Sequence, residues 1–159
     1  MGEAGRPDRK PGGAQAGPGG APFRQRLKVD TCPCGRVDAR GRPLVWADCC
    51  GRYLDHETPA PDAESLMRSR YSAFVRGRSD YLLATWHAST RPPLLELDAA
   101  AKWLGLEVRS HRALDNDHAE VEFVARFREA GRAVRLHERS RFAREQGCWQ
   151  YVDGDQFQV

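Results

Sequence analysis

The sequence lacks long apolar runs and has little lysine. No stretch of the 159 residues approaches the roughly 20 consecutive apolar residues of a membrane-spanning helix, so no contact with a membrane is expected. The first thirty residues also lack the apolar segment of a secretory signal, which favours a cytoplasmic protein. Lysine occurs only at Lys10, Lys28 and Lys102, so arginine supplies nearly all of the positive charge. Because 25 basic residues are interspersed with 22 acidic ones, composition alone does not indicate a nucleic-acid-binding protein.

The chain divides by composition into three parts. Residues 1–22 are rich in Gly, Pro and Ala and have no hydrophobic periodicity, which predicts a disordered tail. Residues 23–57 contain four of the five cysteines and few large apolar side chains. After the boundary near Pro59, residues 58–159 have the patterning of one folded domain.

Four cysteines form two tight pairs, Cys32 with Cys34 and Cys49 with Cys50. Four thiolates suit a tetrahedral zinc ion in a closed, structural site. Disulfides between the pairs, in a secreted chain, and inert buried thiols are the alternatives. Such a short segment needs a source of stability besides the burial of apolar side chains, and structural zinc contributes on the order of 10 kcal/mol of apparent binding energy. We therefore expect these four residues to bind one structural zinc ion.

Helical periodicity comes first in the remaining chain, and alternation follows it. Asp62 is a plausible N-cap for a helix with Met67, Tyr71 and Phe74 on one face, which ends at Gly77. A second helix is expected over 80–87, capped by Ser79. Four strands are then predicted at 103–110, 120–128, 133–144 and 148–153. This order indicates an α+β domain with helices packed on one face of an antiparallel sheet.

The alternation also assigns side chains to the two faces of the sheet. In the first strand it places Leu104, Leu106 and Val108 together on one side. A four-residue loop at 129–132 would set Phe123 opposite Glu138 and so place this carboxylate on the apolar face.

A two-residue turn at Gln146-Gly147 adds further residues to that face and sets Asp153 opposite Ser140. The possible pocket residues are Glu138, Ser140, Asp153, Trp149, Tyr151 and Arg70. Arg70 is the candidate partner of Glu138 in a structural ion pair, unless its charged end reaches solvent. Glu138 is otherwise a pocket carboxylate, and a β-bulge would move all of these assignments.

Several motifs in order resemble the YchJ-like family of uncharacterised bacterial proteins. They are CPCG, DCCGRY, LMRSRYSAF, DYLLATWH, WLGLEV, HERSRF and WQYVDGD. The resemblance implies a SEC-C-type zinc motif followed by a nuclear-transport-factor-2-like (NTF2-like) domain, a cone of curved sheet and helices. The same motif ends the bacterial preprotein translocase ATPase and contacts an export chaperone there, which implies a protein partner for the zinc module. The present loop between the cysteine pairs, GRVDARGRPLVWAD, is longer than is usual in the family.

Three functions are compatible with the sequence. The preferred one is a non-enzymatic, zinc-containing binding or adaptor protein, because a zinc motif is present and no catalytic set is recognisable. The second is an enzyme of hydrolase or isomerase type with a pocket around Glu138, since such cones host many functions. The third, a ribosome- or nucleic-acid-associated zinc protein, is favoured only by the arginines.

Overall fold

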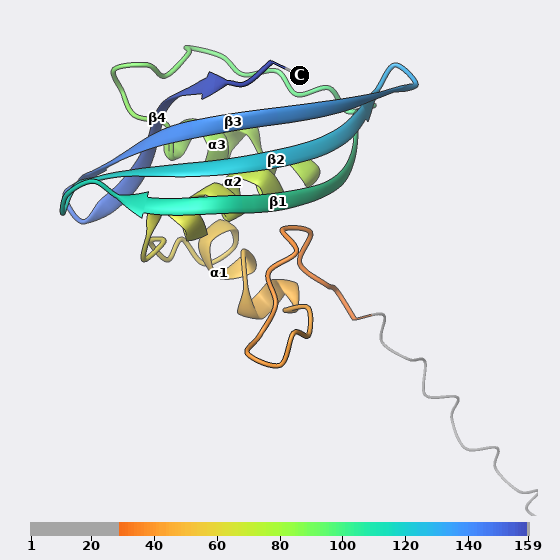
Figure 1. Ribbon diagram of the computed structural model, residues 1–159, viewed down its shortest axis with the longest axis horizontal. Helices are drawn as coiled ribbons and strands as arrows, with labels where there is room; N and C mark the ends of the chain where they lie inside the picture. The colour runs from red at the N-terminus through yellow and green to blue at the C-terminus, as the bar shows by residue number, and fades with distance from the viewer. Residues whose placement is uncertain (1–28, 159) are drawn as a thin grey trace, which may run out of the picture.

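The computed structural model describes residues 29–158. The predicted tail at 1–22 and the start of the cysteine segment lie outside the described residues. In chain order the elements are η1 (Trp46–Asp48, a 3₁₀-helix), α1 (Gly51–Leu54), α2 (Ala63–Val75), α3 (Ser79–Ala84), β1 (Lys102–Ala113), β2 (His118–Glu129), β3 (Arg132–Glu145) and β4 (Cys148–Gln156). The strands form one antiparallel sheet in the order β1-β2-β3-β4. Helices α2 and α3 lie against one face of this curved sheet, which confirms the predicted α+β class (Figure 1).

Helix α2 begins and ends as its sequence predicts. The carboxylate of Asp62 accepts a hydrogen bond from the backbone N–H of Ser65 at 2.7 Å, which confirms the expected N-cap. The helix ends at Val75, and Gly77 follows the C-cap residue Arg76 with a φ of +68°, a conformation that glycine adopts without strain.

Helix α3 is shorter than the expected 80–87. It ends at Ala84 because the next residues bond to β4 instead of continuing the helix. The N–H of Tyr151 donates to the carbonyl of Thr85, and the N–H of His87 donates to the carbonyl of Tyr151.

The predicted register of the central hairpin is confirmed. Phe123 lies opposite Glu138, and Val121 lies opposite Ser140. The turn is two residues long, not four, because Glu129 also pairs with Arg132. Ala130 and Gly131 both have positive φ angles, as a tight hairpin turn of this length requires.

A bulge in β1 changes the face of the sheet on which one predicted residue lies. The pairing with β2 shifts between Trp103 and Gly105, so Leu104 does not share a side with Leu106. Leu104 is 51% exposed, whereas Trp103 packs inward against the ring of Phe127 with centroids 4.7 Å apart. Alternation alone therefore placed Leu104 wrongly.

A second irregularity, between β3 and β4, moves Asp153. Arg141 pairs with Asp153 but Phe142 pairs with Tyr151, so β4 carries one extra residue at this point. Ser140 consequently faces Gly154, and Asp153 lies on the outer face in an ion pair with Arg141. The expected position of Asp153 opposite Ser140 was wrong for this reason.

No helix within residues 29–158 is long and apolar enough to cross a membrane.

Trp103 and Leu104 form a matched pair of substitutions that tests the bulge in β1. We expect Trp103→Ala to lower the free energy of unfolding by about 3 kcal/mol, because large aromatic side chains in cores contribute that much. Leu104→Ala should change it by less than about 0.5 kcal/mol, as exposed sites usually do. Urea denaturation measures both, and equal losses would contradict the bulge.

Candidate functional site: a buried cysteine cluster and a cavity behind it

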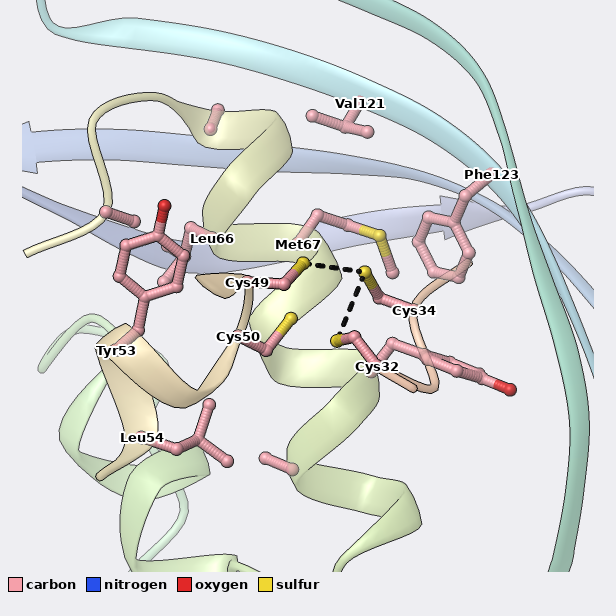
Figure 2. Close-up of a cluster of buried hydrophobic side chains, with 14 of the residues drawn as sticks. Cys32, Cys34, Cys49, Cys50, Tyr53, Leu54, Leu66, Met67, Val121 and Phe123 are labelled. Atoms are coloured by element: carbon pink, nitrogen blue, oxygen red, sulfur yellow. Dashed lines mark hydrogen bonds between the residues drawn. The ribbon is translucent and has the colours of Figure 1, made fainter. Parts of the chain in front are cut away.

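The four sulfur atoms of the paired cysteines converge in the interior. All four lie within 4.8 Å of one another, and every one of these residues is at most 3% exposed. The Sγ atoms of Cys32 and Cys34 are 3.6 Å apart, and those of Cys34 and Cys49 are 3.5 Å apart (Figure 2). The structure thus brings together all four predicted ligands.

The loop between the cysteine pairs and the two short helices around the second pair position these sulfurs. The long loop between the pairs is folded back on itself, with antiparallel bridges joining Thr31 to Val45 and Val37 to Pro43. The second pair lies between η1 and α1, where Gly51 packs against Trp46 so closely that a Cβ would lie 2.7 Å from its carbonyl oxygen. Only glycine fits there, which accounts for the Cys-Cys-Gly sequence.

The donor set fits a tetrahedral metal. Zinc–thiolate bonds of about 2.3 Å place the sulfurs of a tetrahedral site about 3.8 Å apart, close to the two separations above. The four thiols also cannot all ionise without a cation. Hydrogen bonding from Cys34 lowers the pKa of Cys32, whereas hydrogen bonding to Cys32 raises the pKa of Cys49 and of Cys50. A bound cation would remove this conflict by stabilising all four thiolates.

The cysteine segment is docked on one side of α2. Arg68 of this helix donates to the carbonyl oxygen of Cys34 at 3.0 Å, and the hydroxyl of Ser72 lies 3.7 Å from the sulfur of Cys32. In return, Arg36 donates to the hydroxyl of Ser65 and to the carboxylate of Glu64. Side chains before and after residue 58 share one hydrophobic cluster, so the division into two domains at that residue stays a prediction.

The other side of α2 forms a wall of a cavity of about 230 Å³. Met67, labelled in Figure 2, belongs to the same buried cluster as the four cysteines and also lines this cavity. Aromatic rings supply most of the lining, with Arg70, Glu138 and Ser140 as its polar members. The rings are those of Tyr71, Phe74, Trp86, Trp103, Phe123, Phe127, Phe142 and Tyr151.

Glu138 is 8% exposed and is held by two hydroxyl groups. Ser140 Oγ donates to its Oε1 at 2.8 Å, and the phenol of Tyr151 donates to the same oxygen at 3.0 Å. Its side chain lies against the backbone of Gly154, where a Cβ would come within 2.7 Å of the carboxyl carbon. The carboxylate therefore has a fixed orientation at the edge of the cavity.

Arg70 is buried, at 6% exposure, but it does not form the expected ion pair with Glu138. Its Nη1 donates to the carbonyl of Leu82 and to the hydroxyl of Thr85, both at 2.7 Å. The guanidinium lies over the ring of Tyr151, 4.7 Å from its centroid. Tyr151 therefore lies between Arg70 and Glu138: its ring stacks under the guanidinium, and its hydroxyl donates to the carboxylate. Burial lowers the pKa of Arg70 to about 10, so it stays charged at neutral pH.

Comparison with known proteins identifies the family. The model of the YchJ middle NTF2-like domain matches residues 62–154, more than half of the chain. A UPF0225 protein of Polaromonas sp. (strain JS666) is 71% identical over 127 residues, covering 78% of this chain and 91% of that protein. The chain belongs to the UPF0225 family, with a YchJ-like NTF2-like domain.

Solved structures extend the likeness of this UPF0225 protein to the cysteine segment. A SEC-C motif containing protein from Rhodopseudomonas palustris has a TM-score of 0.68 at 32% identity, covering 80% of this chain and 99% of that one. A SEC-C motif containing protein from Psychrobacter arcticus has a TM-score of 0.67 at 32% identity, covering 82% and 85%. The resemblance stated from the motifs is therefore confirmed.

Four of the six expected pocket residues line the cavity of this UPF0225 chain: Glu138, Ser140, Tyr151 and Arg70. Asp153 does not, because of the β4 irregularity. Trp149 lines a different and more polar depression of about 310 Å³ between α3, β4 and the segment after α1. Sequence reasoning missed Trp103, since the bulge at Gly105 reverses the face that alternation assigns to it.

The buried phenols predict how stability depends on pH. Burial raises the pKa of Tyr71 and of Tyr81 to about 12, and burial together with Glu138 raises the pKa of Tyr151. An unfolded tyrosine titrates near pH 10, so above that pH the unfolded chain loses protons that the folded chain keeps. We expect the free energy of unfolding to fall between about pH 10 and 12. Urea denaturation at several pH values checks this, and phenolate absorbance that develops fully near pH 10 in the folded protein would contradict it.

Proposed function

We propose that this UPF0225 protein is a non-enzymatic binding protein whose fold is held by structural zinc and whose cone holds a small ligand. One observation carries the proposal: α2 is the shared wall between the cysteine cluster and an aromatic cavity that contains two buried charged residues. Ligand sites are mostly apolar concavities with a few placed polar groups.

In this proposal Cys32, Cys34, Cys49 and Cys50 hold the zinc ion. Zinc would stabilise the four thiolates and join the two halves of the cysteine segment. Four protein ligands complete its tetrahedron and leave no position for a substrate or reactive water, so the metal would be structural. Thiolate ligands favour a reducing compartment, which supports the cytoplasm as the location.

Contact with a partner protein through the zinc module stays a prediction. Its support is the turn of the long loop, where Val37 is 50% exposed and Arg40 is exposed as well, while Arg42 pairs with Asp38. An exposed apolar residue near the exposed cation Arg40 suits a partner with an acidic surface.

An enzyme with its active site at Glu138 is the second candidate. It is favoured by a carboxylate and a phenol in hydrogen-bond contact inside an apolar cavity, a pairing that acid–base catalysis uses. Ser89 Oγ lies 2.6 Å from Nδ1 of His87, and Glu145 Oε1 lies 2.7 Å from Nε2 of the same ring, so these three residues are connected as in a hydrolase triad. The N–H of Ser89 itself donates to Nδ1 of His87 at 3.1 Å, as in a local turn. An enzyme would convert its ligand, whereas a binding protein would release it unchanged. The nucleic-acid alternative stays a prediction.

Measurement of the zinc content of the purified protein tests whether the four cysteines bind the metal. We expect one zinc ion per chain in the native protein and loss of most of it in Cys50→Ser. Cys148→Ser is the matched control, because Cys148 is exposed and does not belong to the cluster, and this variant should keep its zinc. Full zinc content in a Cys49→Ser/Cys50→Ser double variant would contradict the assignment.

The cavity is tested with toluene as an apolar probe. We expect toluene to shift the NMR signals of residues around Ala125, because the cavity exceeds the roughly 150 Å³ that suffices for benzene. Leu136→Phe should block this by filling the cavity, while Leu104→Phe on the outer face should not. If toluene shifts no lining signal in a folded, zinc-loaded protein, the proposed ligand site is wrong.

A further inference from the structure

The second oxygen of Glu138 is the polar feature of the cavity that the fold leaves unused. Both hydroxyl donors go to Oε1, and Oε2 receives no hydrogen bond from residues 29–158. Within those residues, Arg68 Nε is the one fully buried side-chain N or O atom that has no hydrogen-bond partner. Since Oε2 of Glu138 also has no partner, it is not fully buried and a donor can reach it. A carboxylate oxygen at a largely apolar site gains free energy from a donor, and a ligand in the cavity can supply one.

Charge balance restricts what can supply that donor. Arg70 is the cation that compensates Glu138, and the ring of Tyr151 separates the two. A charged ligand would leave a net charge in an apolar space, which is costly. Because Arg70 and Glu138 attract ions of opposite sign, neither an anion nor a cation gains a net attraction that offsets its desolvation, so the two residues together favour an uncharged ligand.

The volume and the lining of the cavity restrict the rest of the ligand. A cavity of about 230 Å³ holds one or two fused rings, judged against the roughly 150 Å³ that holds benzene. Rings in the wall meet one another at varied angles, as with Tyr71 and Trp103 at 86° and Phe74 and Trp103 at 40°. Walls that offer both faces and edges suit an aromatic ligand, whose own faces and edges pair with them.

We propose that the cavity binds an uncharged aromatic molecule of one or two rings that donates one N–H or O–H to Oε2 of Glu138. Phenols and indole-type heteroaromatics are the chemical class that meets these conditions. The inference rests on the proposed function, since it specifies the ligand of that same cavity.

The test compares indole with benzofuran, which has nearly the same shape but an oxygen in place of the N–H group. By NMR titration, we expect indole to bind at least about tenfold more tightly, as a hydrogen bond to a charged group provides. Glu138→Gln should weaken indole binding about tenfold and change benzofuran binding by less than threefold. Glu107→Gln, an exposed carboxylate of β1, is the matched control and should leave the ratio unchanged.

Gly154→Ala is a second variant that keeps the carboxylate but displaces it, because the new Cβ would meet the Glu138 side chain. It should reduce the preference for indole in the same way, and zinc content and thermal unfolding confirm that each variant is folded. Equal binding of indole and benzofuran to the native protein would overturn the inference while leaving the cavity as a ligand site. Tighter binding of tryptamine or indole-3-acetate than of indole would overturn the requirement for an uncharged ligand. Absence of binding by indole, benzofuran and toluene would overturn the proposed function as well.

Discussion

The rest of the structure depends on four buried sulfur atoms packed against one helix. Their spacing of at most 4.8 Å leaves room for a metal ion but not for water, and their mutual hydrogen bonds cannot satisfy four thiolates. The neighbouring residues allow the sulfur atoms to pack this closely. Gly51 has no side chain to keep Trp46 away, and Ser72 places a small hydroxyl group beside Cys32. A segment with so few apolar residues gains its rigidity from this centre more than from burial of its own side chains.

Helix α2 transmits that rigidity to the cone. Arg68 binds the backbone of the cysteine segment, while Arg70, two residues later, points to the opposite side and caps the end of α3 through the carbonyl of Leu82. The position of the cavity wall is therefore set by contacts on both sides of one helix. A ligand or a metal that orders α2 stabilises the same element, so each would add to the stability that the other provides.

Sequence reasoning recovered what spacing and alternation encode. The cysteine pairs, the N-cap at Asp62 and the register of Glu138 against Phe123 all followed from local pattern and turn position. Irregular backbone was beyond it, because a bulge adds a residue without changing the hydrophobic pattern around it. This is why Leu104 and Asp153 were assigned to the wrong faces. The partners of Arg70 were also missed, since a carbonyl acceptor at the end of a neighbouring helix leaves no mark in side-chain types.

The charged residues of the cavity argue against a purely structural role for it. Replacing two buried residues of opposite charge, such as Arg70 and Glu138, by apolar side chains is often neutral or stabilising, because the cost of desolvating the charges offsets much of their attraction. Small residues at Ala125 and Ser140 likewise leave space that larger side chains could fill with van der Waals contacts. A core shaped by stability alone would tend to lose both the charges and the space. Their presence together in one cavity is what a ligand site requires, because the space admits the molecule and the charges orient it.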